Sequence, residues 1–207
     1  MIRVLLADDH TIVREGLRAL LAEESDFEVV GEASDGREAV ALAEELAPDV
    51  VVMDLAMPKL NGVDATARIR KACPDTQVVV LSMHATAAHV RPALRAGARG
   101  YLVKGSGLGD LRKAVEAVAR GEAFFSPAVA AIVLDADGGA DEARLTSRER
   151  EVLQLVGEGR SSPEIARALG ISVKTIEGHR SRLMGKLGVS NVAGLVRSAV
   201  RLGLVQV

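Results

Sequence analysis

The sequence predicts an α/β protein in which a doubly wound parallel sheet is followed by an all-α domain of four helices. Three observations carry this prediction. Short runs rich in Val, Ile and Leu alternate with helical patterns over residues 1–120, the alternation then stops, and only helical patterns follow. Nearly continuous apolar runs are typical of strands covered on both faces. Regular alternation of strands and helices implies parallel strands joined by right-handed crossovers.

The expected strands of the first domain are short apolar runs, at residues 2–7, 27–32, 50–53, 77–81 and 100–103. The expected helices between them have apolar residues at helical spacing, at residues 12–22, 36–45, 63–71, 91–95 and 108–120. Pro92 limits the fourth helix, because a proline inside a helix costs about 3 kcal/mol. We therefore expect this helix to begin near Arg91, with His89 and Val90 in a longer loop.

A linker is expected at residues 121–143, between a first domain of residues 1–120 and a second of residues 144–207. The stretch 134–144 is rich in small and charged residues and has no periodicity, which is typical of a linker. The four helical patterns that follow lie at residues 147–158, 162–169, 173–185 and 191–202.

Local signals support the helices of the second domain. Thr146 and Glu149 have the spacing of a capping box, in which each residue satisfies a backbone N–H at the helix start. The turn Leu169-Gly-Ile-Ser172 separates the second helix from the third. A short turn with a glycine between two helices indicates a helix-turn-helix.

The charge of the chain is unevenly distributed. The net charge is −2, but residues 1–140 hold 15 Lys/Arg and 21 Asp/Glu, whereas residues 141–207 hold 11 and 7. A basic second domain suits a polyanionic partner. Chance clustering of surface charge would give the same asymmetry, so the charge alone does not decide.

Cysteine usage and hydropathy indicate where the protein acts. The single cysteine, Cys73, excludes an internal disulfide framework and fits a reducing compartment. The N-terminus has no signal-peptide pattern, and no apolar run approaches the roughly 20 residues that a membrane helix needs. We therefore expect a cytoplasmic protein without a membrane partner.

Polar side chains follow four of the five expected strands: Asp8 and Asp9, Asp54, Ser82, and Lys104. The carboxyl ends of parallel strands meet at one edge of a sheet, so these side chains should converge there. Three crowded carboxylates repel each other unless a cation intervenes, and oxygen ligands suit Mg²⁺. With a lysine opposite, such a site can stabilise a phosphoryl group in transfer to a carboxylate.

The first domain resembles the receiver domain of two-component response regulators, which has a flavodoxin-like fold also called CheY-like. The resemblance covers residues 2–120. It rests on four stretches: Leu5-Leu-Ala-Asp-Asp-His10, Met53-Asp-Leu-Ala-Met-Pro-Lys-Leu-Asn-Gly62, Leu81-Ser-Met-His84 and Gly97-Ala-Arg-Gly-Tyr-Leu-Val-Lys104.

This resemblance implies a role for each residue of the expected site. Asp54 accepts phosphate from a sensor histidine kinase. Mg²⁺ is held by Asp8 or Asp9, by Asp54 and by the backbone carbonyl of Ala56. The phosphoryl oxygens are bound by Ser82 and Lys104.

The same resemblance implies roles at three positions that affect switching or phosphoryl lifetime. Tyr101 is the aromatic residue that changes rotamer with phosphorylation. His84, two residues after Ser82, and Ala56, two after Asp54, occupy positions that modulate the lifetime of the phosphoryl group. His84 could equally be an exposed residue without that role.

The expected helix at residues 173–185 has a cationic character that suits phosphates, from Lys174, Arg180, Arg182 and Lys186. Groove-facing side chains for reading bases would be Glu177, Ser181 and Arg182. Glu177 could accept from a cytosine amino group or orient an arginine instead. Gly178 and Gly185 either let the helix approach DNA closely or reflect drift at exposed positions.

The second domain resembles the LuxR-type helix-turn-helix. Joined to a receiver, this is the NarL/FixJ architecture, and the resemblance covers nearly the whole chain. It rests on Leu145-Thr-Ser-Arg-Glu-Arg-Glu-Val-Leu153, Pro163-Glu-Ile-Ala166, Ser172-Val-Lys-Thr-Ile-Glu-Gly-His-Arg180 and Lys186-Leu-Gly-Val189. It implies a helix in the major groove of promoter DNA, with contacts from Lys174, Thr175, His179 and Lys186.

The last helix carries Val192, Leu195, Val196 and Ala199 along one stripe. The resemblance implies that this stripe forms a homodimer interface, and dimers of such domains read paired half-sites. The stripe could instead belong to the domain core, and both roles are compatible. RNA polymerase is a candidate further partner.

The expected function is therefore a transcription regulator switched by phosphorylation of Asp54, not an enzyme beyond its own phosphoryl transfer and dephosphorylation. Two alternatives stay open. The chain could be a Mg²⁺-dependent phosphatase with Asp8 or Asp9 as nucleophile, although it has no cap insertion for a substrate. It could also bind DNA independently of phosphorylation, with the receiver serving only for dimerisation.

Overall fold

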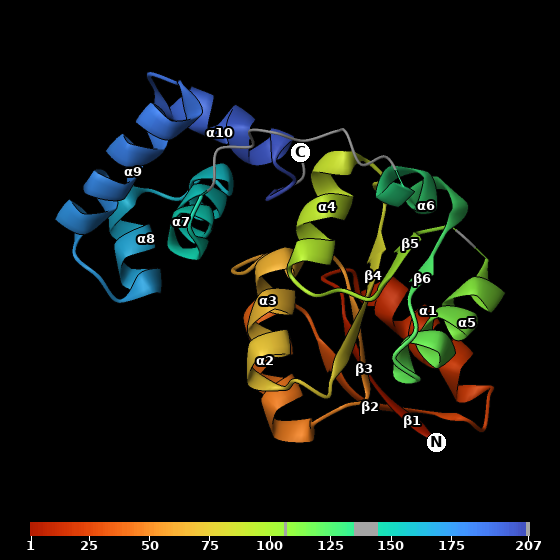
Figure 1. Cartoon of the computed structure of the whole chain (residues 1–207). Coiled ribbons are helices and arrows are strands. Elements are labelled where there is room, and N and C mark those ends of the chain that lie inside the picture. Colours follow the sequence, from red (N-terminus) through yellow and green to blue (C-terminus); the bar gives the residue numbers. More distant parts are fainter. Residues whose placement is uncertain (106, 135–144, 206–207) are drawn as a thin grey trace. The chain divides into compact units, whose positions relative to one another are not determined.

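The chain divides into two compact units, Met1–Asp137 and Gly138–Val207. The computed structural model describes residues 1–105, 107–134 and 145–205 (Figure 1). The first unit is a parallel sheet covered by helices, and the second is helical. The predicted α/β fold followed by an all-α domain is confirmed.

The sheet of the first unit contains six parallel strands in the order β2-β1-β3-β4-β5-β6. Their bounds are β1 Ile2–Ala7, β2 Phe27–Ala33, β3 Val50–Met53, β4 Gln77–Ser82, β5 Gly100–Val103 and β6 Phe124–Phe125. All four residues of β3 are buried, which explains its uninterrupted apolar run. Strands β1 and β3 are neighbouring interior strands, so their carboxyl ends lie side by side at one edge of the sheet.

Within the described part of this unit, six helices accompany the sheet: α1 Thr11–Ala22, α2 Gly36–Leu46, α3 Gly62–Ala72, α4 Ala87–Arg95, α5 Leu108–Ala119 and α6 Pro127–Leu134. One core contains Leu17 of α1 and Val115 of α5 together with sheet residues. A second core contains Ala43 of α2 and Ile69 of α3 on other sheet residues. These cores lie on opposite faces of the sheet, so the arrangement is doubly wound (Figure 1).

The start predicted for the fourth helix is wrong. Helix α4 begins at Ala87 rather than near Arg91 and contains Pro92, so His89 and Val90 are helical. Thr86 is the N-cap, and its carbonyl accepts the N–H of Val90 at 2.9 Å. Proline forfeits only one intrahelical hydrogen bond, and the packing of the fully buried Val90 and Ala93 in the core offsets that loss.

The expected linker also differs from the structure in its first part. Residues 124–134 form β6 and α6, which belong to the first unit. Phe124 and Phe125 pair with Gly100 and Tyr101 of β5, and Val129 is fully buried. A two-residue strand and a uniformly apolar helix have no usable periodicity, so packing rather than pattern determines them. Residues 135–143 of the expected linker lie outside the described residues.

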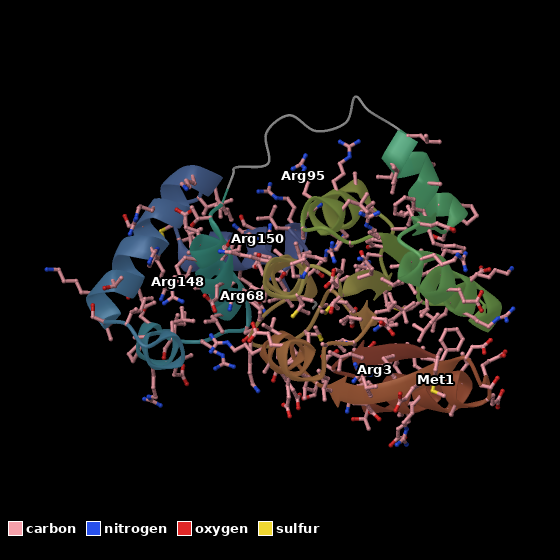
Figure 2. All side chains as sticks on the ribbon, turned by 60° about the horizontal axis from the view of Figure 1, so that its bottom comes forward. Met1, Arg3, Arg68, Arg95, Arg148 and Arg150 are labelled. Carbon is pink, nitrogen blue, oxygen red and sulfur yellow. The ribbon has the colours of Figure 1, made fainter. Side chains whose placement is uncertain are left out.

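The second unit has four helices within its described residues: α7 Ser147–Gly157, α8 Ser162–Leu169, α9 Val173–Leu187 and α10 Val192–Arg201. Their core contains buried apolar residues of each helix: Leu153, Ile165, Ile176, Leu183 and Leu195. The predicted capping box of Thr146 and Glu149 is confirmed. Arg148, labelled in Figure 2, ties α7 to the end of α8, where its Nη2 donates to the Leu169 carbonyl at 3.1 Å.

Gly170 in the left-handed region (φ 64°) ends α8, and Ser172 caps α9. A left-handed residue is easiest for glycine, which explains the glycine of the turn. Among the described helices of both units, none combines the length and apolarity that crossing a membrane requires.

Candidate functional site

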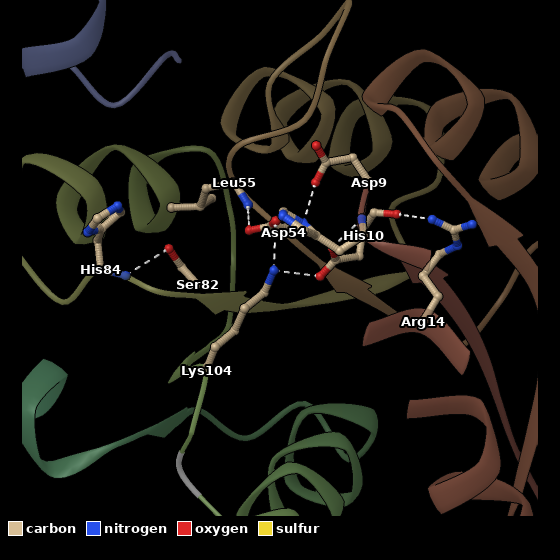
Figure 3. Close-up of polar contacts among 9 residues, drawn as sticks. Asp9, His10, Arg14, Asp54, Leu55, Ser82, His84 and Lys104 are labelled. Carbon is tan, nitrogen blue, oxygen red and sulfur yellow. Dashed lines mark hydrogen bonds and ion pairs between the residues drawn. The ribbon is translucent and has the colours of Figure 1, made fainter. Parts of the chain in front are cut away.

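The polar residues at the strand ends are held by hydrogen bonds that continue the sheet. The N–H groups of Asp8, Asp54 and Lys104 donate to the carbonyls of Ala33, Ala7 and Ser82 at 3.1, 2.8 and 2.7 Å. Each of these residues lies just after its own strand, and a hydrogen bond to the neighbouring strand fixes its backbone. The side chains of Asp8, Asp54 and Lys104 converge as predicted, because Lys104 Nζ contacts both carboxylates. Figure 3 shows Asp54 and Lys104 pointing toward each other.

Lys104 lies between two buried carboxylates. Its Nζ is 2.6 Å from Asp8 Oδ2 and 2.8 Å from Asp54 Oδ2. Asp54 Oδ1 accepts the N–H of Leu55 at 2.7 Å. The ammonium group offsets the repulsion between the carboxylates, which are only 2–3% exposed.

The pKa values of this pair reflect burial and mutual attraction. Burial raises the pKa of Asp54, and the hydrogen bond and charge of Lys104 offset only part of that rise. Burial acts to lower the pKa of Lys104, but the hydrogen bonds and charges of Asp54 and Asp8 raise it overall. The lysine is therefore held in its charged form opposite the carboxylates.

Asp9 and His10 complete the group. His10 Nδ1 lies 2.8 Å from Asp9 Oδ1 and 3.1 Å from Asp8 Oδ1. One ligand atom from each of Asp8, Asp9, His10 and Asp54 lies within 4.8 Å of the others. Three carboxylates at this spacing fit a hard divalent cation such as Mg²⁺. His10 was not among the predicted site residues, although its position directly after the two aspartates could have indicated it.

The loop after β3 packs closely against Asp54. A Cβ atom on Gly62 would lie 1.9 Å from the Asp54 carbonyl oxygen. The Gly62 N–H donates to the Leu55 carbonyl at 2.8 Å, and α3 starts at this glycine with Asn61 as N-cap. Ala56, the expected carbonyl ligand, is half-buried in the same loop.

Lys59, in the loop between β3 and α3, has a strained backbone and connects this loop to α2. Lys59 adopts a left-handed conformation (φ 64°), which is unfavourable for a residue other than glycine. Its Nζ contacts Asp35, the N-cap of α2. Burial acts to raise the pKa of Asp35, but the Lys59 contact and the N–H groups of the helix start lower it overall. The contact therefore fixes the loop to α2.

Ser82 and Tyr101 both hold the backbone of His84. The N–H of His84 donates to Ser82 Oγ at 3.2 Å, and the Tyr101 hydroxyl donates to the His84 carbonyl at 2.6 Å. Tyr101 is fully buried, and burial raises its pKa to about 12. The His84 ring is exposed and stacks on the His89 ring at 4.8 Å. The predicted switch residues are thus joined through the loop between β4 and α4.

Most predicted DNA contacts lie on the exposed side of α9. The opposite side of the helix faces the core, since Ile176 and Leu183 are fully buried. The exposed predicted contacts are Lys174, Thr175, Glu177, Ser181, Arg182 and Lys186, and the half-buried ones are Gly178 and His179. Thr175 Oγ1 is 2.8 Å from Ser172 Oγ, so this side chain takes part in the helix cap.

His179 and Lys186 have contacts within the unit. Burial lowers the pKa of His179, and the charges of Arg182 and Arg148 lower it further. Lys186 Nζ donates to Glu149 Oε2 at 2.7 Å. Glu149 also belongs to the capping box. The sequence predicted Lys186 only as a DNA contact and did not predict its bond to Glu149.

The apolar stripe of α10 divides between core and surface. Leu195 and Ala199 are fully buried in the core of the second unit. Val192 is 43% exposed, and Val196 is partly buried. The core interpretation therefore applies to Leu195 and Ala199, and a dimer contact through Val192 stays a prediction.

Comparisons with known families match both units. Residues 4–116 match the response regulator receiver domain, and residues 143–199 match the family of bacterial regulatory proteins of the luxR type. The chain is 41% identical over 196 residues to the transcriptional regulatory protein LiaR of Bacillus subtilis, covering 92% of this chain and 93% of LiaR. It is 39% identical to the response regulator protein VraR of Staphylococcus aureus, covering 99% of both chains.

Solved structures agree with these matches. The structure of RcsB from Salmonella enterica serovar Typhimurium, bound to the promoter rprA in the presence of the phosphomimetic BeF3⁻, is similar with a TM-score of 0.67. The two chains are 30% identical over 95% of this chain and 96% of RcsB.

Proposed function

Because the chain belongs to the two-component response regulators with a receiver domain and a LuxR-type DNA-binding domain, we propose that phosphorylation of Asp54 controls its binding to promoter DNA. The observation that carries this proposal is the position of Asp54. Its buried carboxylate lies beside a second carboxylate and a charged lysine at the edge of the sheet. A sensor histidine kinase would supply the phosphoryl group, and the protein would act in the cytoplasm.

Mg²⁺ would be held by Asp8, Asp9, Asp54 and the carbonyl of Ala56, and when bound it would neutralise charge on the phosphoryl oxygens. An oxygen of the Asp54 carboxylate attacks the phosphorus atom of a phosphohistidine. The P–N bond breaks as the new P–O bond forms, which leaves an acyl phosphate on Asp54 and a neutral imidazole after protonation.

Lys104 stabilises this transfer electrostatically. Its ammonium group already lies 2.8 Å from Asp54 Oδ2, so a small movement brings it to a phosphoryl oxygen. Ser82 Oγ then donates to another phosphoryl oxygen. Because Ser82 turns toward the phosphoryl group, its Oγ moves away from the His84 N–H that now donates to it. The loop between β4 and α4, which Tyr101 also holds, then rearranges.

This rearrangement favours one of two arrangements of the outer helices, and the favoured one promotes dimerisation and DNA binding. RcsB is bound to a promoter in its solved structure, which supports DNA binding by this chain. The exposed cationic residues Lys174 and Arg182 favour α9 as the helix that would enter the major groove. Val192 on α10 would contribute to the homodimer, and RNA polymerase is a candidate partner of the bound regulator.

The direct test is phosphorylation by phosphoramidate with Mg²⁺. Mass spectrometry should find one acyl phosphate on the wild type and none on Asp54→Asn. The control is Asp26→Asn, an exposed aspartate just before β2 at the other end of the strands, which should be phosphorylated normally. DNA affinity should rise on phosphodonor treatment of the wild type and stay unchanged in Asp54→Asn.

Two outcomes would contradict the proposal. Equal DNA affinity of wild type and Asp54→Asn in all conditions would indicate regulation independent of phosphorylation. Continuous hydrolysis of a model phosphate ester that Asp9→Asn abolishes and Asp54→Asn does not would indicate a phosphatase.

A further inference from the structure

Arg14 of α1 reaches back to the loop that carries Asp8 and Asp9. Its Nη1 donates to the backbone carbonyl of Asp8 at 2.6 Å (Figure 3). The Arg14 N–H donates to the carbonyl of His10 at 3.1 Å, so the residue holds the loop with both backbone and side chain. The side chain is only 14% exposed, so solvent screens its contacts weakly.

The other side of the guanidinium faces β2. Arg14 Nε lies 3.5 Å from Glu32 Oε2, close enough for an ion pair. This nitrogen is buried and has no hydrogen-bond partner among the described residues. Glu32 is opposite Leu6 of β1 in the sheet, next to the strand end that leads into the loop. A guanidinium is planar and always charged, so it can donate to the Asp8 carbonyl while its charge attracts the Glu32 carboxylate.

Arg18 provides an internal comparison. It lies one turn further along α1, and its Nε is also 3.5 Å from Glu32, at Oε1. Its side chain, however, is 58% exposed. Of the two arginines that face Glu32, Arg14 is the one that bonds the Asp8 carbonyl.

The loop that Arg14 holds supplies three of the four residues whose ligand atoms gather beside Lys104: Asp8, Asp9 and His10. A shift of the Asp8 backbone would displace both aspartate carboxylates together. Groups that orient metal ligands without touching the metal commonly change metal affinity strongly when they are mutated.

We infer that Arg14 is a positioning residue for phosphoryl transfer, which fixes the Asp8–Asp9 loop in the geometry that binds Mg²⁺, with Glu32 as its anchor. The inference rests on the proposed function, because it concerns the metal ion of that reaction. It assigns Arg14 no contact with the metal ion or with the phosphoryl group.

The test is the rate of Asp54 phosphorylation by phosphoramidate as a function of Mg²⁺ concentration, with Mg²⁺ binding measured directly by calorimetry. Arg14→Gln should raise the half-saturating Mg²⁺ concentration about tenfold, the lower end of effects for such orienting groups. The rate at saturating Mg²⁺ should recover, because no reacting atom is removed. Arg14→Lys should have a half-saturating Mg²⁺ concentration between those of the wild type and Arg14→Gln. An ammonium group can reach the Asp8 carbonyl but cannot contact Glu32 at the same time. Arg18→Gln, the matched control, should behave as the wild type.

Thermal unfolding of each variant separates a local effect from loss of the fold. Glu32→Gln removes the anchor and leaves Arg14 in place, so it should shift the half-saturating concentration in the same direction by a smaller factor. Unchanged Mg²⁺ dependence in both Arg14→Gln and Glu32→Gln would overturn the inference, as would an equal shift in Arg18→Gln. If the wild type itself forms no acyl phosphate with Mg²⁺, the proposed function fails instead.

Discussion

Lys104 in the first unit and Lys186 in the second are both bound to buried carboxylates. The two arrangements differ in what else these carboxylates bind. Glu149 accepts from Lys186 and also from the N–H and hydroxyl of Thr146. The carboxylates of Asp8 and Asp54 share Lys104 and lie against each other. The Lys186–Glu149 pair joins helices α7 and α9 of the second unit. The Lys104 cluster of the first unit brings together charges that a metal ion and a phosphoryl group would rearrange in the proposed reaction.

The surroundings of the two lysines explain the difference. Lys104 is 12% exposed and Lys186 is 40% exposed. Breaking an ion pair in which both partners are buried leaves an uncompensated charge and costs several kcal/mol. A pair in which the lysine is open to solvent, as in Lys186 with the 5% exposed Glu149, contributes less. Removing Lys104 should therefore cost more free energy than removing Lys186.

The largest effect should come from Lys104→Gln. Without the ammonium group, two buried carboxylates repel, and the free energy of unfolding should fall by about 3 kcal/mol in the absence of divalent ions. Mg²⁺ should restore part of this loss, because it binds only the folded site. Urea unfolding followed by circular dichroism, with EDTA or with Mg²⁺, measures both effects.

The control is Lys113→Gln, whose lysine is 61% exposed and pairs with Asp110 at 4.0 Å. It should change the free energy of unfolding by less than about 0.5 kcal/mol. A loss in Lys104→Gln as small as that of the control would remove the distinction between the two lysines.

Glu149→Gln should have an intermediate effect. Glutamine can keep the capping box but loses the charge that Lys186 binds, so the second unit should be destabilised by about 1 kcal/mol at pH 7. In the folded state, burial acts to raise the pKa of Glu149, but Lys186 and Thr146 lower it overall. The charge therefore stabilises the fold above the unfolded pKa of about 4.3, and this contribution disappears as the pH falls through the lowered folded pKa.

Urea unfolding of the wild type and Glu149→Gln at a series of pH values tests this linkage. The difference between the two proteins should be largest near neutral pH and vanish in acid. A difference that grows as the pH falls would show that the charge of Glu149 does not stabilise the unit.

The smallest effect concerns DNA binding. Lys174 is exposed at the start of α9, so Lys174→Gln should weaken binding and reduce the slope of log affinity against log salt by about 1. Lys186→Gln should leave this slope almost unchanged, because its Nζ is bound to Glu149. Equal slope changes in the two variants would mean that Lys186 leaves Glu149 and contacts phosphate.

The sequence predicted the acidic site well because strand ends are determined by simple geometry. Apolar runs identified the strands, and parallel strands necessarily bring Asp8, Asp54 and Lys104 to one edge. The contacts of Arg14 and Lys186 could not be predicted in this way. Both are long side chains whose partners depend on rotamers, and Glu149 and Lys186 are 37 residues apart in the sequence.

The two errors of the sequence analysis have a common cause. Pro92 lowers helix propensity, and residues 124–134 have no period, but both segments are stabilised by the same core around Tyr101. Val90, Ala93 and Val129 are all fully buried in this core. Tertiary packing therefore overrides local preference here, next to the aromatic residue expected to switch.

The glycine at the start of α3 limits how the pocket could be transplanted. A methyl group on Gly62 would overlap the carbonyl oxygen of Asp54, so the helix start and the end of β3 meet without any room for a side chain. Protein engineers who graft Asp54, the proposed phosphoryl acceptor, onto another sheet would have to bring this helix start with it. A library randomised at Gly62 should return almost exclusively glycine under selection for a functional acceptor.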